Sequence, residues 1–466
     1  MGQMVRKILM AAFFFVACGG VLSAQERKIT LNEAQSRLFR YSPIEIKEID
    51  SALADNEFLV KITSDTWGFF YDCVDRETGL PIDNISKEKV NLYTSITNIG
   101  LYMMCVVGAH DLKIIDRDLA LERLNLALSS LEKMEKWEGN FFNYYWVDTL
   151  EHSGSYISAV DNGWLAAGLI VAKQSFPDEI GQRCKSIFDA MNFKIYYDAK
   201  LGHLSLGFEG SKKKASAFHY GMLCTEPRLT SYIAIAKGDV PVEHWFRLNR
   251  TLPRQWKWQQ QPPRGGRKVY SGYKVFQGYY KYKDFKFVPS WGGSMFEFLM
   301  PALVLNEKEL SSGSFAPNNK TAVDLQIFYA LEENGYPVWG MSPCSIPGDP
   351  EGYAEYGVKH LGAKGYPDEH VVTPHATFLA LEIEPEKAIK NLKELLKYSN
   401  IYGTYGFFDS LNFETGQVNN KYLCLDQAMS FIALCNYLND GAIKKKFHSD
   451  PTIKKYEHLL TVEEFF

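Results

Sequence analysis

The sequence predicts an all-α fold, a closed toroid built from helical hairpins. Apolar side chains recur at helical spacing, as Leu121, Leu124, Leu128 and Leu131 do in "RDLALERLNLALSSLEK". Alternation typical of strands is sparse, and long connections rich in Gly, Pro, Tyr and Trp separate the helical segments. Because the sequence shows no period of the tetratricopeptide or armadillo type, we favour a closed toroid over an open solenoid.

Further helical segments follow along the chain, and several are apolar nearly all round, as buried helices are. They begin near Ser95, Asn162, Thr225, Met295, Val323, Pro374 and Leu425. The stretch "EKAIKNLKELLKY" adds an amphipathic helix with Ile389, Leu392 and Leu396 on one face. No linker separates these segments, so we expect one catalytic domain over residues 27–466.

The first 24 residues have the pattern of a secretory signal peptide. Arg6 and Lys7 precede an apolar run over residues 8–17, which is too short to span a bilayer as a helix. We therefore predict cleavage after Ala24 and export to the periplasm. The stretch "FVAC", which ends at Cys18, leaves a lipid anchor as the alternative, and only that alternative would tie the protein to a membrane.

The motifs of several enzyme classes and of metal sites are missing from the sequence. One of the eight cysteines lies in the signal segment, and the odd number that remains argues against a disulfide framework. There is no Cys-x-x-Cys pair and no close Cys/His spacing, so we expect neither a metal nor an organic cofactor. Phosphate-binding glycine loops, Gly-x-Ser-x-Gly and His-Glu-x-x-His are absent too, which leaves phosphotransfer, esterase and zinc-protease functions unsupported.

The composition favours a glycan over a nucleic acid as the partner. The chain is 46% hydrophobic and 23% charged, as ordinary globular proteins are, and its net charge is −4. The basic, aromatic stretch over residues 264–287 matches no nucleic-acid motif and is interpreted as a surface loop. Aromatic residues make up 14% of the chain, and exposed rings offer flat apolar faces on which sugars stack.

Three acidic residues share one setting, the amino-terminal end of an apolar helix after a polar or glycine-containing turn. They are Asp161 in "SAVDNGWLAAGL", Glu226 in "LCTEPRLTSYIAIA" and Glu297 in "WGGSMFEFLMP". Helix capping is the structural alternative for Asp161 and Glu297, and pairing with a neighbour such as Arg228 is the alternative for Glu226. In a toroid the helix ends line one face, so these acids can converge on a cleft. Two carboxylates across a bound sugar are the usual minimum for glycoside hydrolysis.

The loops carry side chains that suit the binding of a sugar. The predicted substrate-binding residues are Trp67, His219, Arg228, Trp291, Trp339, Tyr353, His375, Tyr405 and Asp409. Each residue alone is more often structural, and their concentration in the loops is what favours a site.

Several segments together resemble a known family. They include "TWGFFYDCVDRETGLPID", "TEPRLTSYIA", "SWGGSMFEFLMP", "YPVWGMSPCSIPGDPEGYAEYGV" and "YGTYGFFDSLNFETG". These segments are similar to the glucoamylase-like proteins of glycoside hydrolase family 144, which act on β-1,2-glucans, and to the related part of cyclic β-1,2-glucan synthases. The resemblance extends from about Trp67 to Tyr437. It implies an (α/α)6 barrel and the hydrolysis of β-1,2-linked glucose chains with inversion at the anomeric carbon.

The resemblance also implies roles for the three acids. Glu226 lies in a segment that matches an acidic motif of the family and becomes the candidate general acid. Asp161 becomes the candidate base or water-positioning residue, and Glu297 a second catalytic or substrate-holding acid. The chain departs from the family at "DEHVV", where relatives are expected to have a smaller, glycine-containing turn, so endo and exo action both stay open.

Two other functions remain open. A polysaccharide lyase on a similar toroid would use Tyr and His as base and acid, with Arg or Asn to neutralise a uronate. A glycan-binding protein with an inactive site would bind sugar without any rise in reducing ends.

Overall fold

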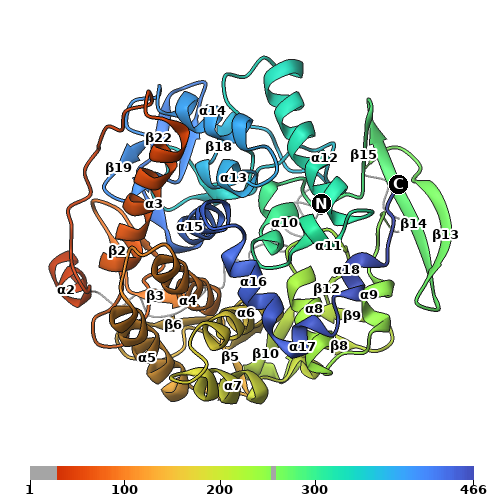
Figure 1. The fold of residues 1–466 in the computed structure, drawn as a ribbon, viewed down its shortest axis with the longest axis horizontal. Helices are drawn as coiled ribbons and strands as arrows, with labels where there is room; N and C mark the ends of the chain where they lie inside the picture. Colours follow the sequence, from red (N-terminus) through yellow and green to blue (C-terminus); the bar gives the residue numbers. More distant parts are fainter. Residues whose placement is uncertain (1–28, 253–258) are drawn as a thin grey trace, which may run out of the picture.

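Helices arranged in a ring form the body of the protein (Figure 1). The computed structural model describes residues 29–252 and 259–466. The predicted signal peptide and Cys18 lie outside these residues. No helix in the described ranges is long and apolar enough to cross a membrane.

Six helices in the described part of the chain form a closed inner ring. They are α4 (Ile96–Asp111), α6 (Ala159–Ser175), α8 (Arg228–Lys237), α10 (Met295–Leu299), α13 (Pro374–Leu379) and α15 (Cys424–Leu438). Helix contacts join α4 to α6, α6 to α8, α10 to α13, α13 to α15, and α15 back to α4. Arg228 on α8 closes the remaining gap, because it donates hydrogen bonds to the main-chain carbonyls of Glu297 and Phe298 on α10.

Other helices lie toward the rim of the toroid in Figure 1. They include α3 (Asp55–Asp72), α5 (Arg117–Lys133), α7 (Gly181–Ala190), α12 (Phe315–Ile327) and α14 (Pro385–Leu395). On α5 and α14 most of the predicted stripe residues are buried, including Leu124, Leu128 and Leu392, whereas Leu121 and Leu396 are only partly buried. The inner helices α4, α6 and α15 are instead buried along nearly their whole length, as their all-round apolar sequences predict.

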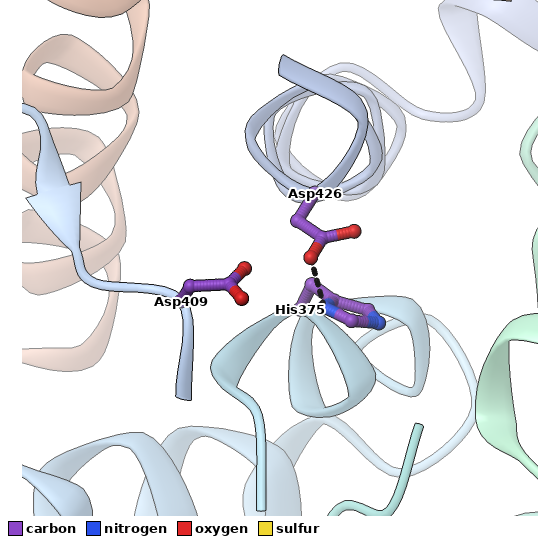
Figure 2. A group of neighbouring side chains, drawn as sticks. All are labelled: His375, Asp409 and Asp426. Carbon is purple, nitrogen blue, oxygen red and sulfur yellow. Dashed lines mark ion pairs between the residues drawn. The ribbon is translucent and has the colours of Figure 1, made fainter. Parts of the chain in front are cut away.

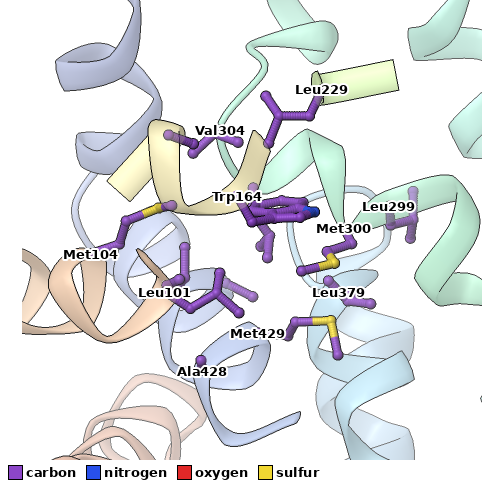
Figure 3. Close-up of a cluster of buried hydrophobic side chains, with 14 of the residues drawn as sticks. Leu101, Met104, Trp164, Leu229, Leu299, Met300, Val304, Leu379, Ala428 and Met429 are labelled. Atoms are coloured by element: carbon purple, nitrogen blue, oxygen red, sulfur yellow. The ribbon is translucent and has the colours of Figure 1, made fainter. Parts of the chain in front are cut away.

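A packed apolar core fills the centre of the ring (Figure 3). Trp164 from α6 is 1% exposed and lies among Leu101, Leu229, Met300 and Met429, which come from neighbouring parts of the ring. The ring is therefore a solid core, and a substrate has to bind at one of its ends.

Two glycines bring α4 and α6 into close contact. A Cβ on Gly168 would lie 2.3 Å from the carbonyl oxygen of Gly100, closer than real Cβ atoms come to their neighbours. Because no side chain separates the two backbones, the first turns of the helices lie side by side, and Thr97 on α4 reaches Asp161 on α6.

Strands are also present, so the strict all-α prediction is not confirmed. Most are two or three residues long, and several lead directly into an inner helix. These are β3 (Tyr93–Ser95) before α4, β7 (Tyr156–Ser158) before α6, β18 (Val371–Val372) before α13 and β23 (Tyr422–Leu423) before α15. Each pairs with a strand distant in sequence, as β7 does with β10 (Gly207–Glu209), and this pairing fixes where the helix begins.

The prediction that residues 264–287 form a surface loop is wrong. It forms β13 (Arg264–Tyr270), β14 (Tyr273–Tyr282) and β15 (Phe285–Phe287), an antiparallel sheet at the edge of the toroid (Figure 1). Three of its basic residues, Arg264, Arg267 and Lys268, lie on the exposed edge strand β13, where charge discourages pairing with another chain.

Candidate active site

Polar side chains at the first turns of the inner helices converge on one end of the toroid. Asp161 on α6 accepts a hydrogen bond from Thr97 on α4, with 2.6 Å between the two oxygens. The negative charges of Asp161 and Glu297 both raise the pKa of Glu226, which places the three predicted acids in one electrostatic cluster. The convergence predicted from the sequence is therefore present.

Asp161 is the third residue of α6 and does not cap the helix. Ser158 is the cap, because its side chain accepts the hydrogen bond of the Asp161 main-chain N–H at 3.3 Å. The Asp161 carboxylate is turned toward Thr97 instead, and burial raises its pKa above the usual range. Its role is thus not explained by capping.

Glu226 lies two residues before α8, which begins without any side-chain cap. Among the described residues, its carboxyl group makes no hydrogen bond or ion pair with another side chain. Burial raises the pKa of Glu226 to about 8, and the charges of Glu297 and Asp161 contribute to the increase. The group therefore holds its proton at neutral pH and is free to donate it.

Glu297 is held rigidly in the first turn of α10. Ser294 and Glu297 form a capping box, in which each side chain accepts the main-chain N–H of the other. The carboxylate also accepts hydrogen bonds from the Ser290 hydroxyl at 2.9 Å and from the Gly292 N–H at 2.9 and 3.0 Å. Glu297 is 3% exposed, and burial raises its pKa. The interpretation of Glu297 as a helix-start residue is confirmed. Its negative charge also raises the pKa of Glu226.

A fourth acid, Glu355, was not predicted as a site residue. Burial raises the pKa of Glu355 to about 7; the nearby Lys364 lowers it and Glu297 raises it. The charges of Glu297, Glu355 and Glu226 all raise the pKa of Tyr366, whose hydroxyl donates to Glu297 at 3.5 Å. The three carboxyl groups therefore lie close enough to this phenol to act on its pKa. Glu355 lies in the segment "EGYAEYGV", which is part of the family resemblance, but the resemblance gave Glu355 no role.

His375, Asp409 and Asp426 form a second buried cluster (Figure 2). The Nδ1 atom of His375 lies 3.3 Å from Asp426 Oδ2, and the carboxylates of Asp409 and Asp426 point toward one another. Burial lowers the pKa of His375 to about 4 and raises that of Asp426 to about 7. It also raises the pKa of Asp409, further increased by the charge of Asp426. Asp426 begins an apolar helix in the same setting as the three predicted acids, and that signal was missed.

Arg228 was predicted to bind substrate, but its contacts within the protein leave no N–H donor free for a substrate. All five N–H donors of its guanidinium are used, two on the Glu307 carboxylate at 2.7 and 2.9 Å and the others on main-chain carbonyls of α10 and of Thr225. Arg228 is 1% exposed. These contacts assign it to the packing of α8 against α10.

Two predicted aromatic residues line a different cleft. Trp67 and Tyr405 border an open cleft of about 450 Å³, which also contains Asp65, Tyr71 and Asp72 and is lined by none of the three acids. Both rings are nearly buried, and the Tyr405 hydroxyl donates to Asp72 at 3.1 Å. A role for either ring in substrate binding stays a prediction.

The remaining predicted residues are scattered. Trp339 is 2% exposed, and its main chain is hydrogen-bonded to Asn391 on α14, so its ring belongs to the core. His219 pairs with Asp198 at 3.2 Å. Tyr353 is exposed on β17 (Tyr353–Ala354), and Trp291 is half-buried in the turn that precedes α10. Trp291 is the neighbour in sequence of Gly292, whose main-chain N–H binds the Glu297 carboxylate.

Two family models match the chain. The model named Glycoamylase, for glucoamylase-like proteins, matches residues 265–451, and a model for a protein of unknown function, DUF3131, matches residues 61–201. The resemblance to glucoamylase-like proteins is confirmed.

Two curated relatives agree with this. A cyclic β-(1,2)-glucan synthase of Rhizobium meliloti is 24% identical and matches 87% of this chain and 18% of its own length. An exo β-1,2-glucooligosaccharide sophorohydrolase of Parabacteroides distasonis is 20% identical and matches 86% of this chain and 57% of its own length. The chain thus spans less than two thirds of either relative.

Solved structures establish the fold. An endo-β-1,2-glucanase from Chitinophaga pinensis, in complex with sophorotriose and glucose, has a TM-score of 0.72 at 19% identity, over 89% of this chain and 99% of that one. A β-1,2-glucanase from Parabacteroides distasonis has a TM-score of 0.70 at 18% identity, over 88% and 60%. At these identities the likeness confirms the helical toroid.

Proposed function

We propose that the protein is a glycoside hydrolase that cleaves β-1,2-glucan or β-1,2-gluco-oligosaccharides. The observation that supports this most strongly is Glu226, a half-buried carboxyl group without a structural partner, which stays protonated near neutral pH beside Asp161 and Glu297. The similarity to β-1,2-glucanases and to a sophorohydrolase supports the substrate class.

In the proposed reaction, Glu226 gives its proton to the glycosidic oxygen as the bond between that oxygen and the anomeric carbon breaks. A water molecule attacks the anomeric carbon from the opposite face, with inversion, and loses its proton to Asp161. Glu297 keeps the pKa of Glu226 high through its negative charge. Glu355, whose carboxyl also lacks a partner among the described residues, is a second candidate for holding the water.

The finer architecture and the export of the protein are part of the proposal. We propose that the inner ring and the rim helices pair as an (α/α)6 barrel within one domain over residues 27–466. Removal of residues 1–24 and release into the periplasm complete the proposal, with a lipid anchor at Cys18 as the alternative. The mass of the mature amino terminus distinguishes the two.

An assay with several polymers tests the proposed function. The purified protein is incubated with linear β-1,2-glucan, β-1,3-glucan, β-1,4-glucan and a uronate polymer, and reducing ends and product sizes are followed. We expect sophorose or short oligosaccharides from β-1,2-glucan alone, and the change of product size with time separates exo from endo action. Unsaturated products from the uronate polymer would favour a lyase, and saturable binding of β-1,2-glucan without products would favour a binding protein.

The pH dependence of activity follows from the raised pKa of Glu226. Because the acid must be protonated to act, we expect kcat/KM to fall as the pH rises through about 8. Asp161→Asn removes a charge that raises this pKa, so the alkaline limb should move to lower pH in the residual activity. The control is Asp118→Asn on the exposed face of α5, which should leave the limb in place. An unmoved limb in Asp161→Asn would mean that a different group titrates.

A further inference from the structure

We propose that His375, Asp409 and Asp426 bind a single divalent cation of the first-row transition series, such as Mn²⁺ or Zn²⁺. Each residue can place one ligand atom within 4.8 Å of the other two. The three side chains come from α13, from the segment just before β21 (Ser410–Asn412) and from α15, and in Figure 2 the Asp409 carboxylate points toward the other two. Their wide separation in the sequence explains why no metal motif was visible there.

The strongest support is a group of buried acceptor atoms without donors. Asp409 Oδ1, both carboxylate oxygens of Asp426, His375 Nε2 and Gln427 Oε1 have no hydrogen-bond partner within the described ranges. Gln427 is 6% exposed and lines the same cavity; its amide nitrogen donates to the Phe407 carbonyl, so its oxygen is the atom left over. Leaving such atoms unpaired is costly, and a set that consists only of acceptors fits a cation.

The negative charge of the cluster also favours a bound cation. Asp409 and Asp426 are 3% and 4% exposed, and in the described structure the one ion pair with a basic side chain is that of Asp426 with His375. The Thr373 hydroxyl fixes this imidazole, because it lies 2.8 Å from Nδ1 and donates to the main-chain carbonyl of Asp409 at 2.7 Å. Two buried carboxylates are therefore left without a full positive charge, which a divalent cation would supply.

The size of the cavity excludes a sugar ring at this point. Its volume is about 10 Å³, which is room for one water-sized occupant. Carboxylate and amide oxygens together with one imidazole nitrogen form a mixed ligand set, of the kind that Zn²⁺ and Mn²⁺ accept. The site does not depend on the proposed hydrolase function, because Glu226 and Asp161 take no part in it.

The test is ion uptake by the whole protein in the absence of any sugar. The protein is freed of metal with a chelator, which is then removed, and Zn²⁺, Mn²⁺, Ca²⁺ and Mg²⁺ are titrated separately by calorimetry. We expect one Zn²⁺ or Mn²⁺ to bind per chain and to raise Tm by roughly 2–4 °C at saturation. Asp426→Asn keeps the size of the side chain and should weaken binding at least about tenfold.

Matched histidine variants distinguish this site from adventitious binding. His375→Gln should weaken binding to a similar extent. His370→Gln removes a His–Glu pair at the surface, in which His370 Nδ1 lies 2.9 Å from Glu414, and should change nothing. Binding that is absent in the wild type, or that is lost only in His370→Gln, would overturn the proposal. A proton shared between Asp409 and Asp426 would then account for the cluster.

Discussion

Glu226→Gln is expected to lower kcat on β-1,2-glucan by roughly 10²- to 10⁴-fold, the usual contribution of a general acid. The amide has the size of the carboxyl group and cannot deliver the proton. Because the Glu226 carboxyl bonds to no other side chain in the described structure, Tm should change little. Steady-state kinetics and thermal unfolding of the same preparation measure both effects.

The control is Glu122→Gln, which changes an exposed acid on the rim helix α5 and should retain wild-type kcat. Retention of most of the activity by Glu226→Gln would remove Glu226 from the mechanism. Glu355, whose pKa of about 7 also suits proton transfer, would then become the candidate general acid.

Arg228→Ala is expected to lower the free energy of unfolding by about 3–5 kcal/mol, because it leaves the buried Glu307 carboxylate without its cation. The side chain of Glu307 is fully buried and is held by Arg228 at 2.7 and 2.9 Å. The loss also frees the main-chain carbonyls of Glu297 and Phe298 in α10. Urea unfolding followed by circular dichroism measures the change.

Arg183→Ala is the matched control. Arg183 forms a similar two-point pair with Glu132, at 2.8 Å for both contacts, but both partners are partly exposed. Such a surface pair contributes about 0–1 kcal/mol, so the variant should unfold almost as the wild type does. Wild-type stability of Arg228→Ala combined with a raised KM would restore the predicted role in substrate binding.

The helices and the place of the acids could be predicted because both depend on local patterns. Stretches that are apolar nearly all round predicted the buried helices α4, α6 and α15. The pattern of an acid at the start of an apolar helix singled out Asp161 and Glu226. The short strands were missed, because two or three residues are too few for alternation to be recognised. Their pairing depends on partners far away in the sequence.

The side chains around the acids were harder to predict, because residue type does not reveal burial. Arg228 and Trp339 are residue types that bind sugars, and yet both are buried by contacts from other helices. Glu355 was missed for the opposite reason, since nothing local shows that the fold brings it beside Glu297. Asp426 carries the local signal of an acid at the start of an apolar helix, but nothing local shows that it lies beside His375.

The most direct test of the central claim is the position of a bound substrate. A crystal structure of the Glu226→Gln variant with a β-1,2-gluco-oligosaccharide should show a glycosidic oxygen about 2.7–3.2 Å from the side chain at position 226. Asp161 should lie on the opposite face of the same sugar. A chain bound only in the cleft lined by Trp67 and Tyr405, with no sugar at the acids, would contradict the account.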